Sequence, residues 1–143
     1  PMGRPDMAYF GFADKIMHGK KIDIYNNGDM LRDFTYIDDI VEGVTRILTH
    51  IPVPEDPTGA KYKIYNIGNH NPVRLMDFIT VLEKAIGREA EKNFMPMQPG
   101  DVYQTYADVS ELEKDFGFKP DTPLEVGLTA FAEWYAKYYS REK

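Results

Sequence analysis

The chain has 143 residues, a net charge of −6 at pH 7 and no cysteine. The acidic balance repels polyanions at long range, so nucleic acid is not expected as a partner. The absence of cysteine excludes a disulfide framework and thiolate chemistry, and it fits a reducing compartment such as the cytoplasm. No apolar stretch approaches the ~20 residues that span a bilayer, so no membrane association is expected.

Hydrophobic residues make up 43% of the sequence, which is enough for one compact domain over residues 1–143 with a core of its own. Residues 51–60 carry three prolines and one glycine, which disfavour regular structure. This segment is interpreted as a surface loop within that domain, since typical domain sizes leave little room for two.

The first predicted elements are a helix and a hairpin. Apolar residues recur at helical spacing from Met7 to a stop at Gly19. The run Asn-Asn-Gly-Asp at 26–29 tolerates positive φ and can reverse the chain. Residues 22–25 and 30–36 are therefore predicted to form the two strands of a hairpin.

A second helix is predicted to follow the hairpin, starting at Asp39. Asp39 and Glu42 have the spacing of a capping box. The apolar face of this helix would consist of Ile40, Val41, Val44, Ile47 and Leu48.

The second half of the chain is predicted to alternate short strands and helices. Strands are expected at 62–67 and 90–95, and helices at 75–86, closed by Gly87, and at 109–116. In a final helix, Thr122 would be the N-cap, Pro123 the first-turn proline and Glu125 the capping-box acid. The strands are too few for a complete doubly wound sheet, so some apolar surface needs cover from elsewhere.

Arg32 is the leading candidate for a binding residue. It lies on a predicted strand after the turn, where a guanidinium offers the charge and the fork geometry that grip a phosphate. The alternative is an ordinary surface ion pair with Asp29, Asp33 or Asp38, which would contribute little.

Five sequence runs carry a resemblance to a known family. They are GRPDMA, NNGDMLRDFTYIDDI, YNIGNHNPVRLMDFI, MQPGDVYQTYAD and GFKPDTPLEVGLTAFAEWY. Together they resemble the C-terminal part of extended short-chain dehydrogenase/reductase enzymes acting on nucleotide sugars, and within these the UDP-glucuronate 4-epimerases. The resemblance implies an α/β fold of mixed short strands and helices, the substrate-binding portion without the N-terminal dinucleotide-binding half.

The resemblance also implies that the chain is a fragment. The family's glycine-rich dinucleotide loop and catalytic Tyr-x-x-x-Lys pair lie upstream in the intact enzyme. Tyr139 and Lys143 match that spacing, but they follow every other family segment, and the match is interpreted as chance. No catalytic residue and no bound cofactor are therefore expected in this chain, while NAD is expected in the intact enzyme.

Two arginines receive roles from the resemblance. Arg32 would contact the diphosphate of a UDP-sugar. Arg4 would lie near the sugar, where a cation could accommodate the glucuronate carboxylate. The alternative for Arg4 is a frayed terminus without a role.

Four further residues are implied to surround the nucleotide. The strand with Asp23 and Tyr25 would lie along the uracil and read it through backbone groups, although the alternation also suits any half-buried strand. Gln98 and Asp101 would belong to a loop that closes over the nucleotide, with the aspartate near the ribose hydroxyls. Without the family, Asp101 is an ordinary turn residue. UDP-galactose 4-epimerases tend to have arginine at the position of Gln98, which favours the glucuronate branch.

The predicted function is binding of the nucleotide sugar in an NAD-dependent 4-epimerase of UDP-glucuronate and UDP-galacturonate. The alternatives are a UDP-glucose 4-epimerase, a nucleotide-sugar 4,6-dehydratase, or a non-catalytic binding module. Because the N-terminal half is the expected packing partner, the fragment alone is expected to self-associate in part. It is also expected to lack activity, because the catalytic pair lies in that half. His18, His50 and His70 show no metal-ligand spacing, and Gly68 is too isolated for a dinucleotide loop.

Overall fold

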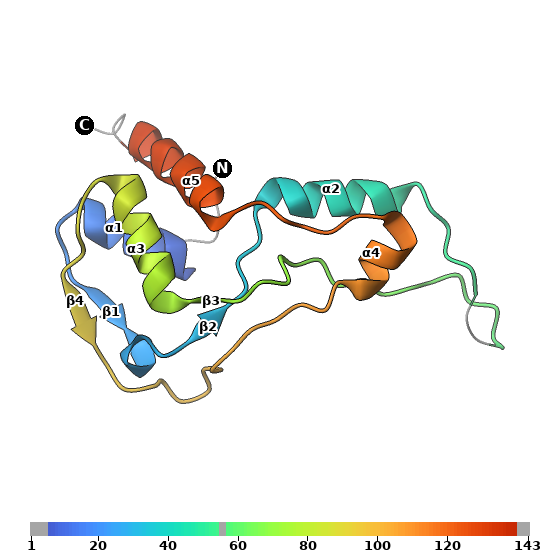
Figure 1. The fold of residues 1–143 in the computed structure, drawn as a ribbon, viewed down its shortest axis with the longest axis horizontal. Coiled ribbons are helices and arrows are strands. Elements are labelled where there is room, and N and C mark those ends of the chain that lie inside the picture. The colour runs from blue at the N-terminus through green and yellow to red at the C-terminus, as the bar shows by residue number, and fades with distance from the viewer. Residues whose placement is uncertain (1–5, 55–56, 140–143) are drawn as a thin grey trace. The chain divides into compact units, whose positions relative to one another are not determined.

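The computed structural model describes residues 6–54 and 57–139, which form two compact units (Figure 1). Unit 1 combines three stretches of the sequence: the amino-terminal stretch to residue 32, residues 73–104, and the stretch from 123 onward. Unit 2 consists of residues 33–72 and 105–122.

Unit 1 holds most of the regular structure. Its elements are α1 (Ala8–Met17), β1 (Ile22–Ile24), the 3-10 turn η1 (Tyr25–Gly28), β2 (Leu31–Arg32), β3 (Val73–Arg74), α3 (Leu75–Ile86), β4 (Lys92–Phe94) and α5 (Leu124–Tyr139). The strand β1 pairs with β4 in parallel, and β2 pairs with β3 antiparallel. The α/β fold class and the expected shortage of strands are therefore confirmed.

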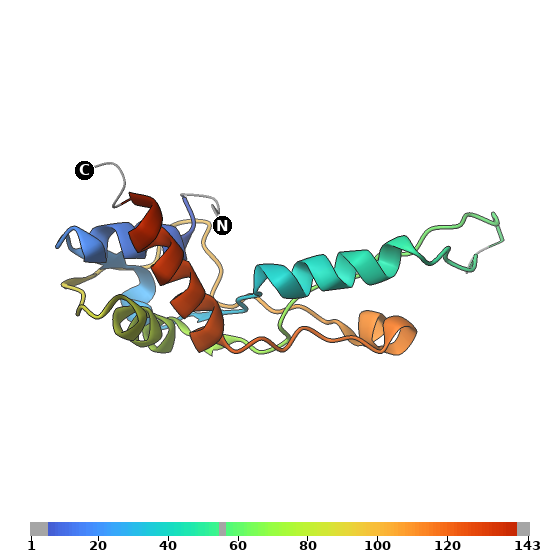
Figure 2. The same ribbon diagram turned by 90° about the horizontal axis from the view of Figure 1, so that it is seen from above.

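The core of unit 1 forms where α1, α3 and α5 come together (Figure 2). Its side chains are apolar residues at helical spacing, joined by both isoleucines of β1: Phe10, Ala13, Ile16, Ile22, Ile24, Phe78, Ile79, Leu82, Leu128, Phe131, Ala132 and Tyr135. Burying a large apolar side chain of this kind stabilises the fold by about 1.5–3 kcal/mol. The predicted helices over 75–86 and after Pro123 are confirmed.

The predicted cap at the end of α3, Gly87, is confirmed, but the predicted N-cap of α5, Thr122, is wrong. Gly87 has a φ of +75° and caps α3 in the left-handed region, which glycine enters without a Cβ penalty. The hydroxyl of Thr122 donates to Asp39 Oδ1 at 2.8 Å, so Thr122 is not the N-cap that the sequence predicts. Instead, the carbonyl of Pro123 accepts the first helical N–H groups of α5.

The predicted hairpin is wrong, although three of its four turn residues have a positive φ. Asn26 and Asn27 have φ values of +48° and +50°, and Gly28 has +81°. The chain nevertheless does not fold back to pair β1 with β2. The Asn27 N–H donates to the Met95 carbonyl at 3.0 Å, which extends the contact between this segment and the end of β4. Pairing with β4 accompanies the burial of both isoleucines of β1, an outcome that depends on residues about 70 positions away and that a local turn signal cannot reveal.

Unit 2 contains the helices α2 (Ile37–Leu48) and α4 (Ser110–Phe116). The predicted helix at 109–116 is confirmed, and the helix predicted from Asp39 begins two residues earlier, at Ile37. The proposed capping box is wrong. Asp39 accepts hydrogen bonds from Thr122, and Glu42 pairs with Arg46 at 2.6 Å.

The strand predicted at 62–67 is also wrong, since both sheets of the described residues lie in unit 1. Lys63 pairs with Glu111 at 2.7 Å, and Tyr65 donates to Asp115 at 2.7 Å, so side chains tie this segment to α4. A sequence with strand propensity needs a partner strand before it forms a ladder.

One apolar face of α2 is open to solvent in the described structure. We name Ile37, Val41, Val44 and Leu48 the α2 stripe, because they recur at helical spacing and all are exposed. The predicted inward face of this helix is thus only partly inward, and Gly43 is its one buried residue. Among the residues with described structure, none of the helices combines the length and apolar character that a membrane span requires.

Candidate functional site

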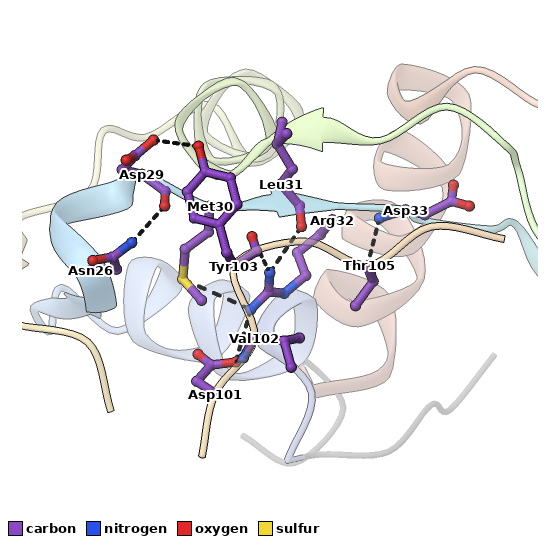
Figure 3. A network of polar contacts seen from close by, with 10 residues as sticks. All are labelled: Asn26, Asp29, Met30, Leu31, Arg32, Asp33, Asp101, Val102, Tyr103 and Thr105. Carbon is purple, nitrogen blue, oxygen red and sulfur yellow. Dashed lines mark hydrogen bonds and ion pairs between the residues drawn. The ribbon is translucent and has the colours of Figure 1, made fainter. Parts of the chain in front are cut away.

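Arg32 ends strand β2 of unit 1, and its guanidinium is fixed by three oxygen atoms (Figure 3). Its Nη1 donates to the carbonyls of Leu31 at 2.9 Å and Tyr103 at 3.0 Å. Its Nη2 donates to Asp101 Oδ1 at 2.9 Å. The side chain is 21% exposed, so the group is sheltered but reachable.

The acidic partner of Arg32 is Asp101, and not one of the acidic neighbours that the sequence offered as the alternative. Asp29 accepts a hydrogen bond from the Tyr103 hydroxyl at 3.1 Å. Asp33 accepts backbone N–H groups within unit 2. The structure therefore pairs the two residues that the resemblance assigns to the diphosphate and the ribose.

Asp101 lies in a tight turn together with Gln98. The Asp101 N–H donates to the Gln98 carbonyl at 3.2 Å, and Gly100 has a φ of +84°, a value that suits glycine. Asp101 Oδ1 accepts a second hydrogen bond from the Val102 N–H at 2.8 Å. Among the described residues, both hydrogen bonds to this carboxylate end on Oδ1.

Tyr103 is a site residue that the sequence interpretation missed. Its carbonyl accepts from the Leu31 N–H at 3.0 Å as well as from Arg32, and its hydroxyl reaches Asp29. That hydrogen bond to Asp29 raises the pKa of Tyr103. The available signal was a tyrosine two positions after Asp101 in a polar loop, because a tyrosine combines an apolar ring with a polar tip.

The side chain of Asp23 is committed to its own unit. Its Oδ2 accepts from Lys15 Nζ at 2.8 Å, and its Oδ1 accepts from Asn93 Nδ2 at 2.9 Å. The hydrogen bond from Lys15 lowers the pKa of Asp23. Any contact of Asp23 with a base would therefore come from its backbone, as the resemblance implies.

The backbone edge of β1 is consistent with such a contact. The Ile22 N–H donates to Glu91, and the Ile24 carbonyl accepts from Met95. Because neighbouring residues of a strand point their backbone groups to opposite sides, the N–H and C=O of Asp23 lie on the edge away from β4. In the described part of the chain, β1 pairs with β4 alone.

The structure says less about the other predicted binding residues, Tyr25, Gln98 and Arg4. Tyr25 begins η1 and is half-buried, and Gln98 has an exposed side chain. Within the described residues, no hydrogen bond or ion pair joins Arg32 to Asp23 or Tyr25. Arg4 lies outside the described residues.

Unit 2 has a polar centre of its own around Asp33. Asp33 Oδ2 accepts from the backbone N–H groups of His70 at 3.1 Å and Ala107 at 3.2 Å. A Cβ on Gly68 would lie 2.3 Å from the Ala107 Cβ. Gly68 is thus required for close packing, and the space beside its backbone is already filled.

The packing of Gly68 against Ala107 bears on whether this segment could bind a dinucleotide. A dinucleotide loop needs several glycines between a strand and a helix, with backbone open to the pyrophosphate. Gly68 stands alone and faces Ala107, so the backbone at Gly68 does not form a dinucleotide loop.

A family model described as GDP-mannose 4,6 dehydratase matches residues 9–131. The chain belongs to this family. A probable UDP-glucuronate 4-epimerase of Rhizobium meliloti is 47% identical, covering 99% of this chain and 45% of the relative. Protein CapI of Staphylococcus aureus is 48% identical with the same coverage.

A solved member of similar fold is the UDP-glucuronic acid 4-epimerase of Bacillus cereus, crystallised with UDP-glucuronic acid and NAD. It superimposes with a TM-score of 0.83 at 33% identity, covering 97% of this chain and 42% of that chain. The resemblance that the sequence motifs carry is therefore confirmed. The chain spans less than half the length of these family members.

Proposed function

We propose that this chain is the nucleotide-sugar-binding region of an NAD-dependent UDP-sugar 4-epimerase, with UDP-glucuronate and UDP-galacturonate as substrates. The observation that carries the proposal is the pairing of Arg32 with Asp101, 69 residues further along the chain, at 2.9 Å. Two residues with complementary roles toward a nucleoside diphosphate thus share one place in unit 1. The likeness to UDP-glucuronate 4-epimerases over nearly the whole chain supports the same function.

In this proposal Arg32 binds the diphosphate. A guanidinium has five N–H donors, and three hydrogen bonds to oxygen are already made. Nη2 also faces the Met30 sulfur at 3.9 Å, and a thioether is a weak acceptor. A phosphate oxygen accepts far more strongly than a thioether, and it can compete with the Asp101 carboxylate for the same nitrogen.

The other residues complete the proposed site. Asp101 would accept from the ribose hydroxyls through Oδ2, and Gln98 would belong to the covering turn. The backbone at Asp23 and the ring of Tyr25 would face the uracil, and Arg4 would meet the sugar carboxylate.

The chemical step is proposed to lie outside these residues. Bound NAD would supply hydride removal and return at C4 of the sugar in the whole enzyme. The described residues contribute binding, and we propose that the 143-residue chain alone has no epimerase activity. Product formed by the purified chain from UDP-glucuronate and NAD would contradict this part.

A 4,6-dehydratase is the second candidate, because the matching family model carries that description. A UDP-glucose 4-epimerase and a non-catalytic module are further alternatives. Gln98 favours the glucuronate branch, since an arginine at this position would give the diphosphate a second cation.

The remainder of such an enzyme would also cover the α2 stripe. We propose that the N-terminal half is the natural partner of this face, and that the isolated chain self-associates in part through exposed apolar side chains.

A titration followed by amide NMR tests the binding proposal. The protein is titrated with UDP, UDP-glucose and UDP-glucuronate. The proposal expects shifts at Arg32, Asp101 and Val102 with all three ligands, and the tightest binding with UDP-glucuronate. Absence of shifts in unit 1, or shifts confined to other residues, would refute it.

A further inference from the structure

We infer that the Arg32–Asp101 ion pair is a latch that favours ligands carrying a phosphate and a vicinal diol on one molecule. This inference rests on the proposed function and adds a selection rule to it. The two residues satisfy each other before a ligand arrives, so a ligand must satisfy both of them to replace the pair without loss.

The two halves of the latch differ in freedom. Arg32 is held by the carbonyls of Leu31 and Tyr103 as well as by Asp101, so its guanidinium stays in place when the carboxylate leaves. Asp101 is held by Arg32 and by the N–H of its neighbour Val102. The carboxylate is therefore the part that moves.

Tyr103 limits how far the loop can open. Its hydroxyl is bound to Asp29, and its carbonyl is bound to Leu31 and Arg32. These contacts fix the carboxyl end of the loop. Opening of the latch thus reduces to a rotation of the Asp101 side chain and its turn.

A ligand with phosphate but no diol meets a penalty at this latch. Its anion takes the place of the carboxylate at Arg32, and Asp101 is left beside a second negative charge without its cation. Like charges in one partly sheltered place repel, and the side chains are only 21% and 31% exposed. Inorganic pyrophosphate should therefore bind poorly to the natural protein.

A ligand with diol but no phosphate has the opposite shortfall. It can donate to Asp101, but if the carboxylate turns toward the diol, Arg32 loses its carboxylate acceptor and gains none in exchange. A nucleoside diphosphate offers both groups, so its binding exceeds what its two parts predict. Selectivity of this kind comes from a penalty on the wrong ligand as much as from contacts with the right one.

Calorimetric titration of three probes tests the latch: UDP, inorganic pyrophosphate and uridine. The variant is Asp101→Asn, which removes the negative charge and keeps the shape. Asp77→Asn is the matched control, because Asp77 is an exposed aspartate in the first turn of α3 in the same unit. We expect Asp101→Asn to bind pyrophosphate about 5- to 10-fold more tightly than the natural protein, the scale of one ordinary hydrogen bond.

The affinity for UDP is expected to stay unchanged in Asp101→Asn. The variant loses the carboxylate that accepts from the diol, and this loss offsets the weaker repulsion of the diphosphate. Asp77→Asn should leave all three affinities within about 2-fold. Equal pyrophosphate affinity in the natural protein and in Asp101→Asn overturns the latch, and the proposed function stands if UDP binding still depends on Arg32. If no probe binds to either protein, both the latch and the proposed function are overturned.

Discussion

Gly68 and Asp33 show how single residues shape unit 2. The backbone at Gly68 approaches Ala107 so closely that an added Cβ would lie 2.3 Å from the Ala107 Cβ. The Asp33 carboxylate ties the same two segments through the N–H groups of His70 and Ala107. The missing side chain of Gly68 and the part-buried hydrogen bonds of Asp33 thus stabilise the same contact between two segments.

We expect Gly68→Ala to destabilise the protein by about 1–3 kcal/mol, because overpacking forces backbone or side chains to shift. Gly11→Ala is the matched control. It lies in α1 with nothing within 4 Å of an added Cβ, and alanine favours helix there. Urea unfolding measures both, and an unchanged midpoint for Gly68→Ala would show that the close approach is not constrained.

At this scale, residue types could be predicted from sequence, but partners could not. Arg32 was identifiable as a strand-borne guanidinium, and Asn26, Asn27 and Gly28 as positive-φ residues. The partner of Arg32 lies 69 residues away, in a loop whose approach depends on the whole of unit 1. Hydrogen bonds of that range are set by tertiary packing, so local patterns offered only the nearer aspartates as possible ion-pair partners.

Packing between helices depends on a hydrogen bond inside the aromatic cluster of unit 1. Tyr135 on α5 is buried against Phe10 of α1, and its hydroxyl donates to Asp14 Oδ1 at 2.7 Å. Burial, and then the hydrogen bond to Asp14, raise the pKa of Tyr135 far above its usual value near 10. The folded state therefore holds this phenol neutral at pH values where the unfolded chain ionises it.

The sign of the pH dependence follows from that direction. A pKa raised on folding gives stability that is fully present below the unfolded pKa, near 10, and that is lost as pH rises toward the folded pKa. We expect the urea midpoint to fall between pH 9 and pH 11, and to fall less in Tyr135→Phe, which has no phenol at this position. At pH 8 the same variant should lose about 1 kcal/mol, since one hydrogen bond is removed.

Tyr138→Phe is the control for this experiment, because Tyr138 lies on the same helix and is exposed. It should keep the alkaline decline of the natural protein. If Tyr135→Phe and the natural protein lose stability equally above pH 10, the buried phenol is not the cause.

Elements were predictable to different degrees for a physical reason. The helices α3, α4 and α5 follow from apolar periodicity and from local signals such as Gly87. The strand predicted at 62–67 and the hairpin both failed, because a strand exists only with its partner. Strand propensity can be read from the local sequence, but which strand becomes the pairing partner depends on the fold of the whole chain.

At the scale of the whole molecule, the apolar side chains of the α2 stripe are exposed to solvent. Leu48 is 78% exposed, and the rest of the α2 stripe lies on the same face. The family members are more than twice as long as this chain. Both facts agree with the proposal that further protein covers the stripe.

We expect the isolated chain to self-associate in part at high concentration and to bind a hydrophobic dye. The double variant Val41→Lys/Leu48→Lys should reduce both effects, because charges in an apolar contact are costly to desolvate. Thr45→Lys, on the same helix but outside the stripe, should not reduce them. A monodisperse natural chain by light scattering, with no dye binding, would contradict the expectation.

The proposed function depends on Arg32 binding a diphosphate, and the affinity of Arg32→Ala for UDP tests it most directly. Arg88→Ala is the matched control, since Arg88 is an arginine of unit 1 that donates to the Met17 carbonyl. We predict that Arg32→Ala weakens UDP binding by about 1.5–3 kcal/mol, the scale of a charged hydrogen bond, while Arg88→Ala binds as the natural protein does. Equal UDP affinity in a folded Arg32→Ala protein would contradict the proposed function.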